Sequence, residues 1–151
     1  MRAEALERSL RVVFERATAL TERLERHGPY RSTDALLKRA RRLLKEMTEE
    51  EKIAVLNAHP RIGADPATLS ELSRREQGRP EEGEVSRALA ALNEAYERRF
   101  GFRFVVFADH RAKSQIIPVL RERLRRSRDE ELATGISEFV AIARDRLSRR
   151  P

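Results

Sequence analysis

The middle of the chain contains side chains suited to acid–base chemistry. His59 is followed by Pro60, and Ser73, Glu76 and Gln77 come a little further along. Spacings of three and four residues place the last three on one face of a helix. A hydroxyl, a carboxylate and an amide on that face could line a pocket, with an imidazole nearby in sequence to move protons. The alternative is a helix with buried first turns and a solvated last turn.

His59 is expected at the end of a helix, because Pro60 disfavours the helical conformation for the residue before it. The stiff dipeptide would hold the imidazole in place, and a side chain at a helix end is expected to contribute little to the core. An ordinary helix end without a catalytic role is the alternative. His27 is predicted to be exposed and His110 to lie in a loop. The three histidines share no metal-ligand spacing, so we predict no metal site.

The composition indicates one soluble globular domain over residues 1–151. Of the 151 residues, 40% are hydrophobic and 38% charged, and there is no cysteine. The lack of cysteine excludes a disulfide framework, a thiol nucleophile and a thiolate metal site. The N-terminus is charged, and no apolar run is long enough to span a bilayer. We therefore predict a cytoplasmic protein with no membrane partner.

The net charge of +7 raises the question of nucleic-acid binding. Arginine and glutamate are interleaved through most of the chain, which is typical of a salt-bridged helix surface. The two Tyr and six Phe residues do not alternate with basic residues as a base-stacking platform requires. We predict no nucleic-acid partner, although a basic all-α nucleic-acid-binding module remains the alternative. A basic surface could equally attract a small anionic substrate.

Apolar residues recur with a helical period through most of the chain. Turn and capping residues divide the pattern, and Ser32 or Thr33, Thr48 and Ser127 are expected to cap helices. The predicted fold class is all-α, a single compact domain of about seven or eight helices with one short extended segment. The clearest helical stretches are 5–24, 33–47, 49–57, 65–77, 81–100, 116–124 and 128–147. Pro118 is expected early in its helix, where it costs least.

The extended segment is Phe102–Phe107, FRFVVF, the only β-like run in the sequence. With no partner strand in view, it is expected to pass between helices. Its main-chain N–H and C=O groups need partners, so it could form an edge that reads a ligand.

Four short motifs, in their order along the chain, resemble those of the OHCU decarboxylase family, whose substrate is 2-oxo-4-hydroxy-4-carboxy-5-ureidoimidazoline. The resemblance rests on Ala58–Gly63 (AHPRIG), on Ser73–Gln77 (SRREQ), on Asn93–Phe102 (NEAYERRFGF) and on Phe104–Ala108 (FVVFA). It covers nearly the whole chain, and the arginine-rich final helix fits the same pattern.

The resemblance implies a cofactor-free carboxy-lyase that converts OHCU into (S)-allantoin and carbon dioxide in urate breakdown. It further implies a homodimer, with His59 as proton donor and acceptor and Glu76 as its partner carboxylate. The substrate-binding positions that it implies are Pro60, Ser73, Arg74, Arg75, Glu76, Gln77, Phe104, Val105, Val106, Phe107, Ala108 and Arg111.

Three features depart from the family pattern. His110–Ala112 (HRA) stands where the family usually has Gly-Arg-Ser, which bears on the role of the arginine. The tryptophan common in the N-terminal helix is absent, and the loop after Gly63 is shortened. A relative that kept the fold and lost the chemistry is therefore a third interpretation. The joint presence of His59, Glu76 and Gln77 argues against it.

Overall fold

The computed structural model describes residues 10, 13–14, 17–63 and 83–148. These residues form six α-helices and no β-strand, which confirms the predicted all-α class. The helices are α2 (Thr18–Arg26), α3 (Thr33–Glu46), α4 (Glu49–Asn57), α6 (Gly83–Phe100), α7 (Lys113–Arg123) and α8 (Arg128–Ser148). The helix predicted over 65–77 lies outside the described residues. None of the six described helices has the length and apolar character needed to cross a bilayer.

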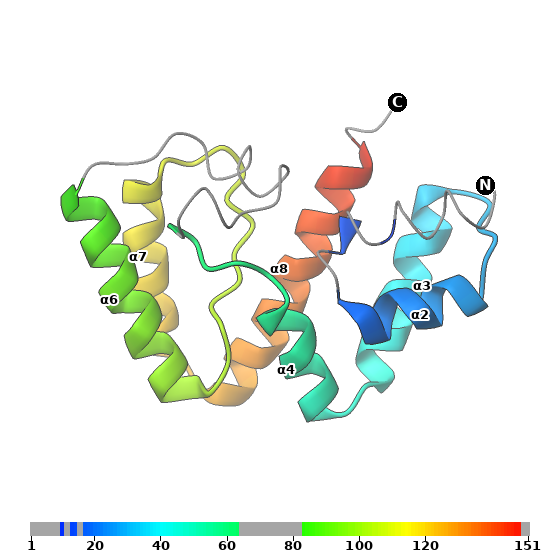
Figure 1. The fold of residues 1–151 in the computed structure, drawn as a ribbon, viewed down its shortest axis with the longest axis horizontal. Helices are drawn as coiled ribbons and strands as arrows, with labels where there is room; N and C mark the ends of the chain where they lie inside the picture. The colour runs from blue at the N-terminus through cyan, green and yellow to red at the C-terminus, as the bar shows by residue number, and fades with distance from the viewer. Residues whose placement is uncertain (1–9, 11–12, 15–16, 64–82, 149–151) are drawn as a thin grey trace.

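The long helix α8 runs through the middle of the structure (Figure 1). Helices α3 and α4 pack on it, and α2 packs on both α3 and α4. Helices α6 and α7 lie side by side and run in the same direction. They can do so because residues 101–112 return along them between the end of one helix and the start of the next, as Figure 1 shows.

The capping residues lie where the sequence predicts them. Ser32 is the N-cap of α3, and its hydroxyl accepts the main-chain N–H of Ala35 at 3.1 Å. Reciprocal hydrogen bonds begin α4 and α8: Thr48 with Glu51 at 3.0 and 3.1 Å, and Ser127 with Glu130 at 3.2 Å in both directions. Each pair satisfies two main-chain donors that a helix start leaves free.

The continuous helix predicted over residues 5–24 is wrong, because the chain leaves the helical conformation at Ala17, where ψ is 78°. The break lets Phe14 stack on Phe139 of α8, with ring centroids 5.8 Å apart, while Leu20 stays in the core. A packing contact between distant parts of the chain thus overrides local periodicity.

The predicted place of Pro118 is also wrong. Helix α7 begins at Lys113, so this proline is its sixth residue and lies in the helix interior. The early start has a local cause, since the Gln115 side chain accepts the N–H of Ala112 at 2.8 Å.

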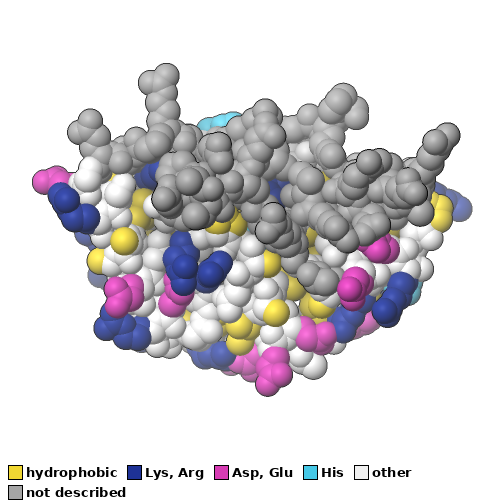
Figure 2. Space-filling view, in the orientation of Figure 1, with side chains coloured by type: hydrophobic (Ala, Val, Ile, Leu, Met, Phe, Trp, Pro, Cys, Tyr) yellow, Lys and Arg dark blue, Asp and Glu magenta, His cyan; other side chains and the backbone are white. Residues whose placement is uncertain are grey.

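Acidic and basic side chains are mixed on the face seen in Figure 2. Between a loop and a helix, Glu97 of α6 accepts two hydrogen bonds from Arg61, at 2.7 and 2.8 Å. Within helices, Arg98 pairs with Glu94 four residues earlier. This mixing is what the interleaved sequence predicts, and it is unlike a continuous basic face for nucleic acid.

Helix α8 approaches α4 closely at Gly135. A Cβ atom at this position would lie 3.0 Å from Cδ1 and 3.3 Å from Cδ2 of the fully buried Leu56. The missing side chain therefore sets the spacing between α8 and the helix that leads to His59.

We predict that Gly135→Val lowers the free energy of unfolding by about 1–3 kcal/mol, because the added methyl groups overpack against Leu56. The matched control is Ala133→Val, at an exposed position of the same helix. It should cost only about 0.5 kcal/mol from helix propensity. Urea denaturation of both variants provides the measurement, and equal losses would contradict the close approach.

Candidate functional site

His59 lies directly after α4 and is buried, with 6% of its surface exposed. Its ring meets the edge of Phe139 in α8, with centroids 5.1 Å apart. Its Nε2 atom has no hydrogen-bond partner within the described part of the chain. The expectation that this side chain adds little to the core is therefore wrong. The reason is tertiary: α8 passes beside the end of α4 and covers the imidazole.

Burial, followed by the positive charge of Arg146, lowers the pKa of His59 from 6.5 to about 3. Both causes act against the imidazolium, because the charged form would lose its hydration and would face a cation. The imidazole is therefore neutral at pH 7. In that form it can accept a proton from a bound molecule.

Arg146 is a buried cation that the sequence interpretation missed. It lies near the end of α8 with 2% of its surface exposed, and its Nη1 donates to the carbonyl of Val13 at 3.3 Å. The signal was its register: it follows Phe139 by seven residues and Ala143 by three, so it lies on the apolar face of the helix. Its positive charge is close enough to His59 to disfavour the imidazolium.

Arg103 brings the segment before α7 to the end of α4. Its main-chain N–H donates to Oδ1 of Asn57 at 3.0 Å, and its Nη1 donates to the carbonyls of Asn57 and His59, both at 2.9 Å. As a result, His59 and the Phe104–Ala108 segment, which are far apart in sequence, are neighbours in the fold.

Segment 104–108 has no regular secondary structure, and its main-chain bonds alternate. The Val105 carbonyl accepts from Arg123 at 2.6 Å, and the Phe107 N–H donates to Glu138 at 3.4 Å. The N–H and C=O of Val106 have no hydrogen bond within the described residues. In an extended chain, neighbouring residues direct these groups to opposite edges. The main chain of Val105 and Phe107 is therefore bound to the protein, and the N–H and C=O of Val106 are left for another partner.

Arg111 folds back onto the end of this segment. Its Nε donates to the carbonyl of Ala108 at 3.0 Å and its Nη2 to that of Phe107 at 2.7 Å. The turn before it places Asp109 and His110 in the left-handed region, with φ of 49° and 64°. Glycine adopts this conformation most readily, and the family pattern has glycine at the position of His110. The left-handed conformation of His110 therefore carries a backbone strain of about 1 kcal/mol or more. The predicted role of Arg111 in binding an anion stays a prediction.

Of the other predicted site residues, Pro60 follows His59 and is half-buried. Ser73, Arg74, Arg75, Glu76 and Gln77 lie outside the described residues. Their nearness to His59 stays a prediction.

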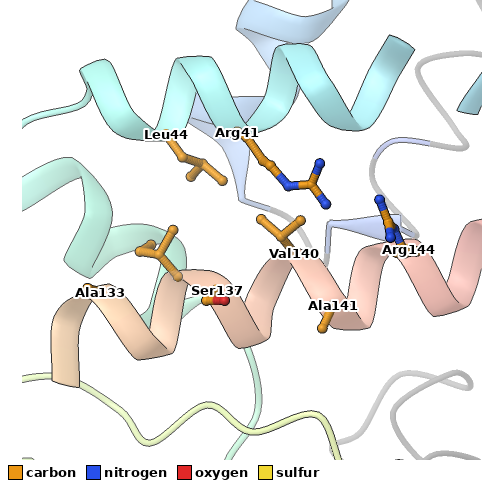
Figure 3. A pocket seen from close by; sticks show the side chains of 8 residues that line it. Arg41, Leu44, Ala133, Ser137, Val140, Ala141 and Arg144 are labelled. Carbon is orange, nitrogen blue, oxygen red and sulfur yellow. The ribbon is translucent and has the colours of Figure 1, made fainter. Parts of the chain in front are cut away.

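Two hollows are lined by described residues, and His59 is not among the residues that line them. One, of about 390 Å³, lies between α3 and α8, with Arg41 and Arg144 near one end and Leu44 and Val140 in its wall (Figure 3). The other, of about 710 Å³, is lined by Arg61, Ile62 and Gly63, which follow His59 in sequence, and by residues of α6. The candidate site is therefore centred on the buried imidazole and its neighbours.

Comparisons with known proteins agree with one another. The family model described as OHCU decarboxylase matches residues 1–148. A Haloferax volcanii protein named 2-oxo-4-hydroxy-4-carboxy-5-ureidoimidazoline decarboxylase is 29% identical over 142 residues, covering 91% of this chain and 84% of the relative. The Bacillus subtilis uric acid degradation bifunctional protein PucL is 31% identical over 153 residues, covering 98% of this chain but only 31% of that protein.

Solved structures show the same fold. A crystal structure of OHCU decarboxylase in the presence of (S)-allantoin matches with a TM-score of 0.79 at 20% identity, covering 99% of this chain and 97% of that chain. A structure of (S)-allantoin synthase matches with a TM-score of 0.73 at 17% identity, covering 98% of this chain and 50% of that one.

We predict that His59 makes the fold less stable in acid. The pKa of His59 is about 3 in the folded protein, below the ordinary 6.5, so the unfolded chain takes up the proton more readily. The free energy of unfolding should therefore fall as the pH drops from about 6.5 toward 3, by up to roughly 1.4 kcal/mol per pH unit from this residue. Urea denaturation across this range should give a flatter pH dependence for His59→Leu than for the wild type.

His27→Leu is the control for this measurement, because it removes an exposed histidine at the end of α2. It should keep the wild-type pH dependence. If His59→Leu kept it as well, the buried neutral imidazole would be disproved.

Proposed function

We propose, because the chain belongs to the OHCU decarboxylase family, that it removes the carboxyl group of OHCU to form (S)-allantoin and carbon dioxide. The observation that carries the proposal is the buried His59, which burial and the charge of the buried Arg146 keep neutral. The main-chain edge at Val106 supports it, since Arg103 holds that segment next to His59. A proton acceptor, an anion-binding group and an amide-reading edge are what this substrate requires.

The reaction needs little more than orientation and proton movement. In OHCU the carboxylate is attached to a ring carbon that also bears a hydroxyl, next to a conjugated imine. When the C–C bond breaks, carbon dioxide leaves and the electron pair moves into this system, giving an enol-like species. The hydroxyl then loses its proton, and the neighbouring ring carbon and the former imine nitrogen each gain one. The net reaction consumes one proton, and delivery to one face of the ring gives a single enantiomer.

His59 would supply the proton steps. A neutral imidazole can accept the hydroxyl proton and, once charged, donate it to the adjacent carbon. Burial and the charge of Arg146 lower the pKa of His59. A bound anionic substrate would raise this pKa again, because its negative charge would offset that of Arg146. We propose that the carboxylate of Glu76 acts in the same direction.

The remaining polar groups would hold the ring and its ureido arm. We propose that the N–H and C=O of Val106 pair with an amide of the ring, as a neighbouring strand would. Ser73 and Gln77 would bind the ureido group, and Pro60 would limit the movement of the imidazole. Arg74 and Arg75 are proposed to border the same pocket.

We further propose that the protein acts without a cofactor as a single domain over residues 1–151, as a homodimer in the cytoplasm. The family resemblance supports the dimer. The absence of cysteine is in keeping with the proposed location. Size-exclusion chromatography with light scattering would measure the oligomeric state directly, and a monomer would contradict the proposed dimer.

Fresh OHCU, generated in situ from urate, tests the proposed function. We expect (S)-allantoin, followed by circular dichroism, to form faster than OHCU decays by itself. His59→Leu should lose roughly 10²–10⁴-fold in rate while remaining folded. Glu76→Gln should lower kcat more than it raises KM, because shape is kept while charge is lost. Racemic allantoin at the spontaneous rate would refute the proposal.

The two arginines near the site can be separated by their effect on KM. Arg146→Lys keeps a buried charge but loses the two-pronged geometry, so we expect a rise in KM of roughly tenfold. Arg111→Ala should raise KM as well, by a smaller factor, because two of its donors already bind Ala108 and Phe107. An unchanged KM for Arg111→Ala would assign Arg111 to the turn alone, and an unchanged KM for Arg146→Lys would remove Arg146 from substrate binding.

A further inference from the structure

We propose that Arg123 is a positioning residue for this reaction, fixing segment 104–108 so that the free main-chain edge at Val106 faces the substrate. The proposal rests on the proposed function. Arg123 is the last residue of α7 and is not among the substrate-binding positions implied by the family resemblance.

The contacts of Arg123 tie the segment to the helices. Arg123 is 5% exposed, and its Nη1 donates to the carbonyl of Val105 at 2.6 Å. The guanidinium also lies over the ring of Phe104, 4.5 Å from its centroid. Two successive residues of the segment, one through its main chain and one through its side chain, are thus held by the same cation.

Arg123 is itself fixed by Glu131, which is fully buried at the start of α8. Nε of Arg123 donates to Oε1 of Glu131 at 2.7 Å, and the hydroxyl of Tyr96 donates to the same oxygen at 2.7 Å. Burial, followed by this hydrogen bond, raises the pKa of Tyr96 well above its usual range, so the phenol stays a donor. Groups from α6, α7 and α8 therefore leave the guanidinium one orientation.

This orientation decides which way the segment points. With the Val105 carbonyl held by Arg123, the N–H and C=O of Val106 are directed to the opposite edge. A displacement of about 1 Å at a substrate-orienting group can cost roughly 10²-fold in rate. A residue that never touches substrate can therefore control turnover through the segment that does.

Arg126 offers a matched control within the same network. Its Nη1 donates to the other oxygen of Glu131 at 3.0 Å and to the Thr134 hydroxyl at 2.9 Å. None of its contacts within the described residues is with segment 104–108. Arg126→Met thus weakens the surroundings of Glu131 without releasing the segment.

The experiment compares KM and kcat for OHCU among the wild type, Arg123→Lys and Arg126→Met. We expect Arg123→Lys to raise KM about fivefold or more and to lower kcat about tenfold or more. Arg126→Met should stay within about twofold in both. A purely structural role would reduce only the folded fraction, which lowers the apparent kcat and leaves KM unchanged. An unchanged KM for Arg123→Lys, or equal effects of the two variants, would overturn the proposal.

A second pair of measurements covers loss of folding. The double variant Arg123→Met with Glu131→Gln removes both buried charges together, so neither is left unpaired. It should fold, as judged by circular dichroism, and show the same raised KM. Hydrogen exchange of the main-chain amides in segment 104–108 should be faster in Arg123→Lys than in Arg126→Met. No increase in exchange would overturn the positioning role.

The same data separate the two proposals. A wild type without OHCU turnover would refute the proposed function, and with it the use of Arg123 in that reaction. Faster exchange confined to Arg123→Lys would in that case still show that Arg123 positions the segment. Turnover in the wild type with an unchanged KM in Arg123→Lys would overturn the inference alone.

Discussion

The carboxylate of Glu131 is fully buried, and side chains from several elements around it donate hydrogen bonds to its charge. An ion removed from water must be paired and hydrogen-bonded, and losing one partner of such a pair costs about 3–5 kcal/mol. Here Arg123, Arg126 and Tyr96 together supply the donors. Because these residues come from α6, α7 and the loop before α8, satisfying one carboxylate locks the mutual placement of three helices.

The same network extends to the proposed site. Arg123, which Glu131 holds in place, donates a hydrogen bond to the carbonyl of Val105 in segment 104–108. At the other end of this segment, Arg111 donates to the carbonyls of Phe107 and Ala108. Arg103 joins the segment to His59. Arg123 and Arg111 therefore hold this short, irregular piece of chain by main-chain acceptors that a β-sheet would otherwise satisfy. Arg103 acts differently, because its guanidinium donates to the carbonyls of Asn57 and His59. The main-chain groups of the buried Val106 are left without a hydrogen bond within the described residues, as they would be on the edge strand of a sheet.

The imidazole of His59 illustrates how burial fixes the protonation state of a titratable group. A solvated histidine is partly charged near neutral pH, whereas this one is neutral because burial and Arg146 both oppose the charged form. An anionic ligand bound to the guanidinium would reduce that opposition and raise the pKa of the imidazole. Under the proposed function, ligand binding and the capacity to hold a proton would be coupled through one cation, which suits a reaction that begins with an anion and consumes a proton.

Local chemistry in the sequence determined the helix starts at Ser32, Thr48 and Ser127, the all-α class and the extended run before α7. Capping, periodicity and turn formation depend on residues a few positions apart, which a sequence displays directly. The family resemblance likewise followed from motifs and their order.

Only the tertiary structure decided which side chains are buried together. The break at Ala17 accompanies a contact between Phe14 and Phe139 of α8. His59 is covered because α8 passes beside it. Arg146 and its neighbours in sequence look like one more stretch of a charged helix until that helix is placed in the core. The physical reason is that burial, and with it the pKa and pairing of a charged group, depends on which distant elements meet.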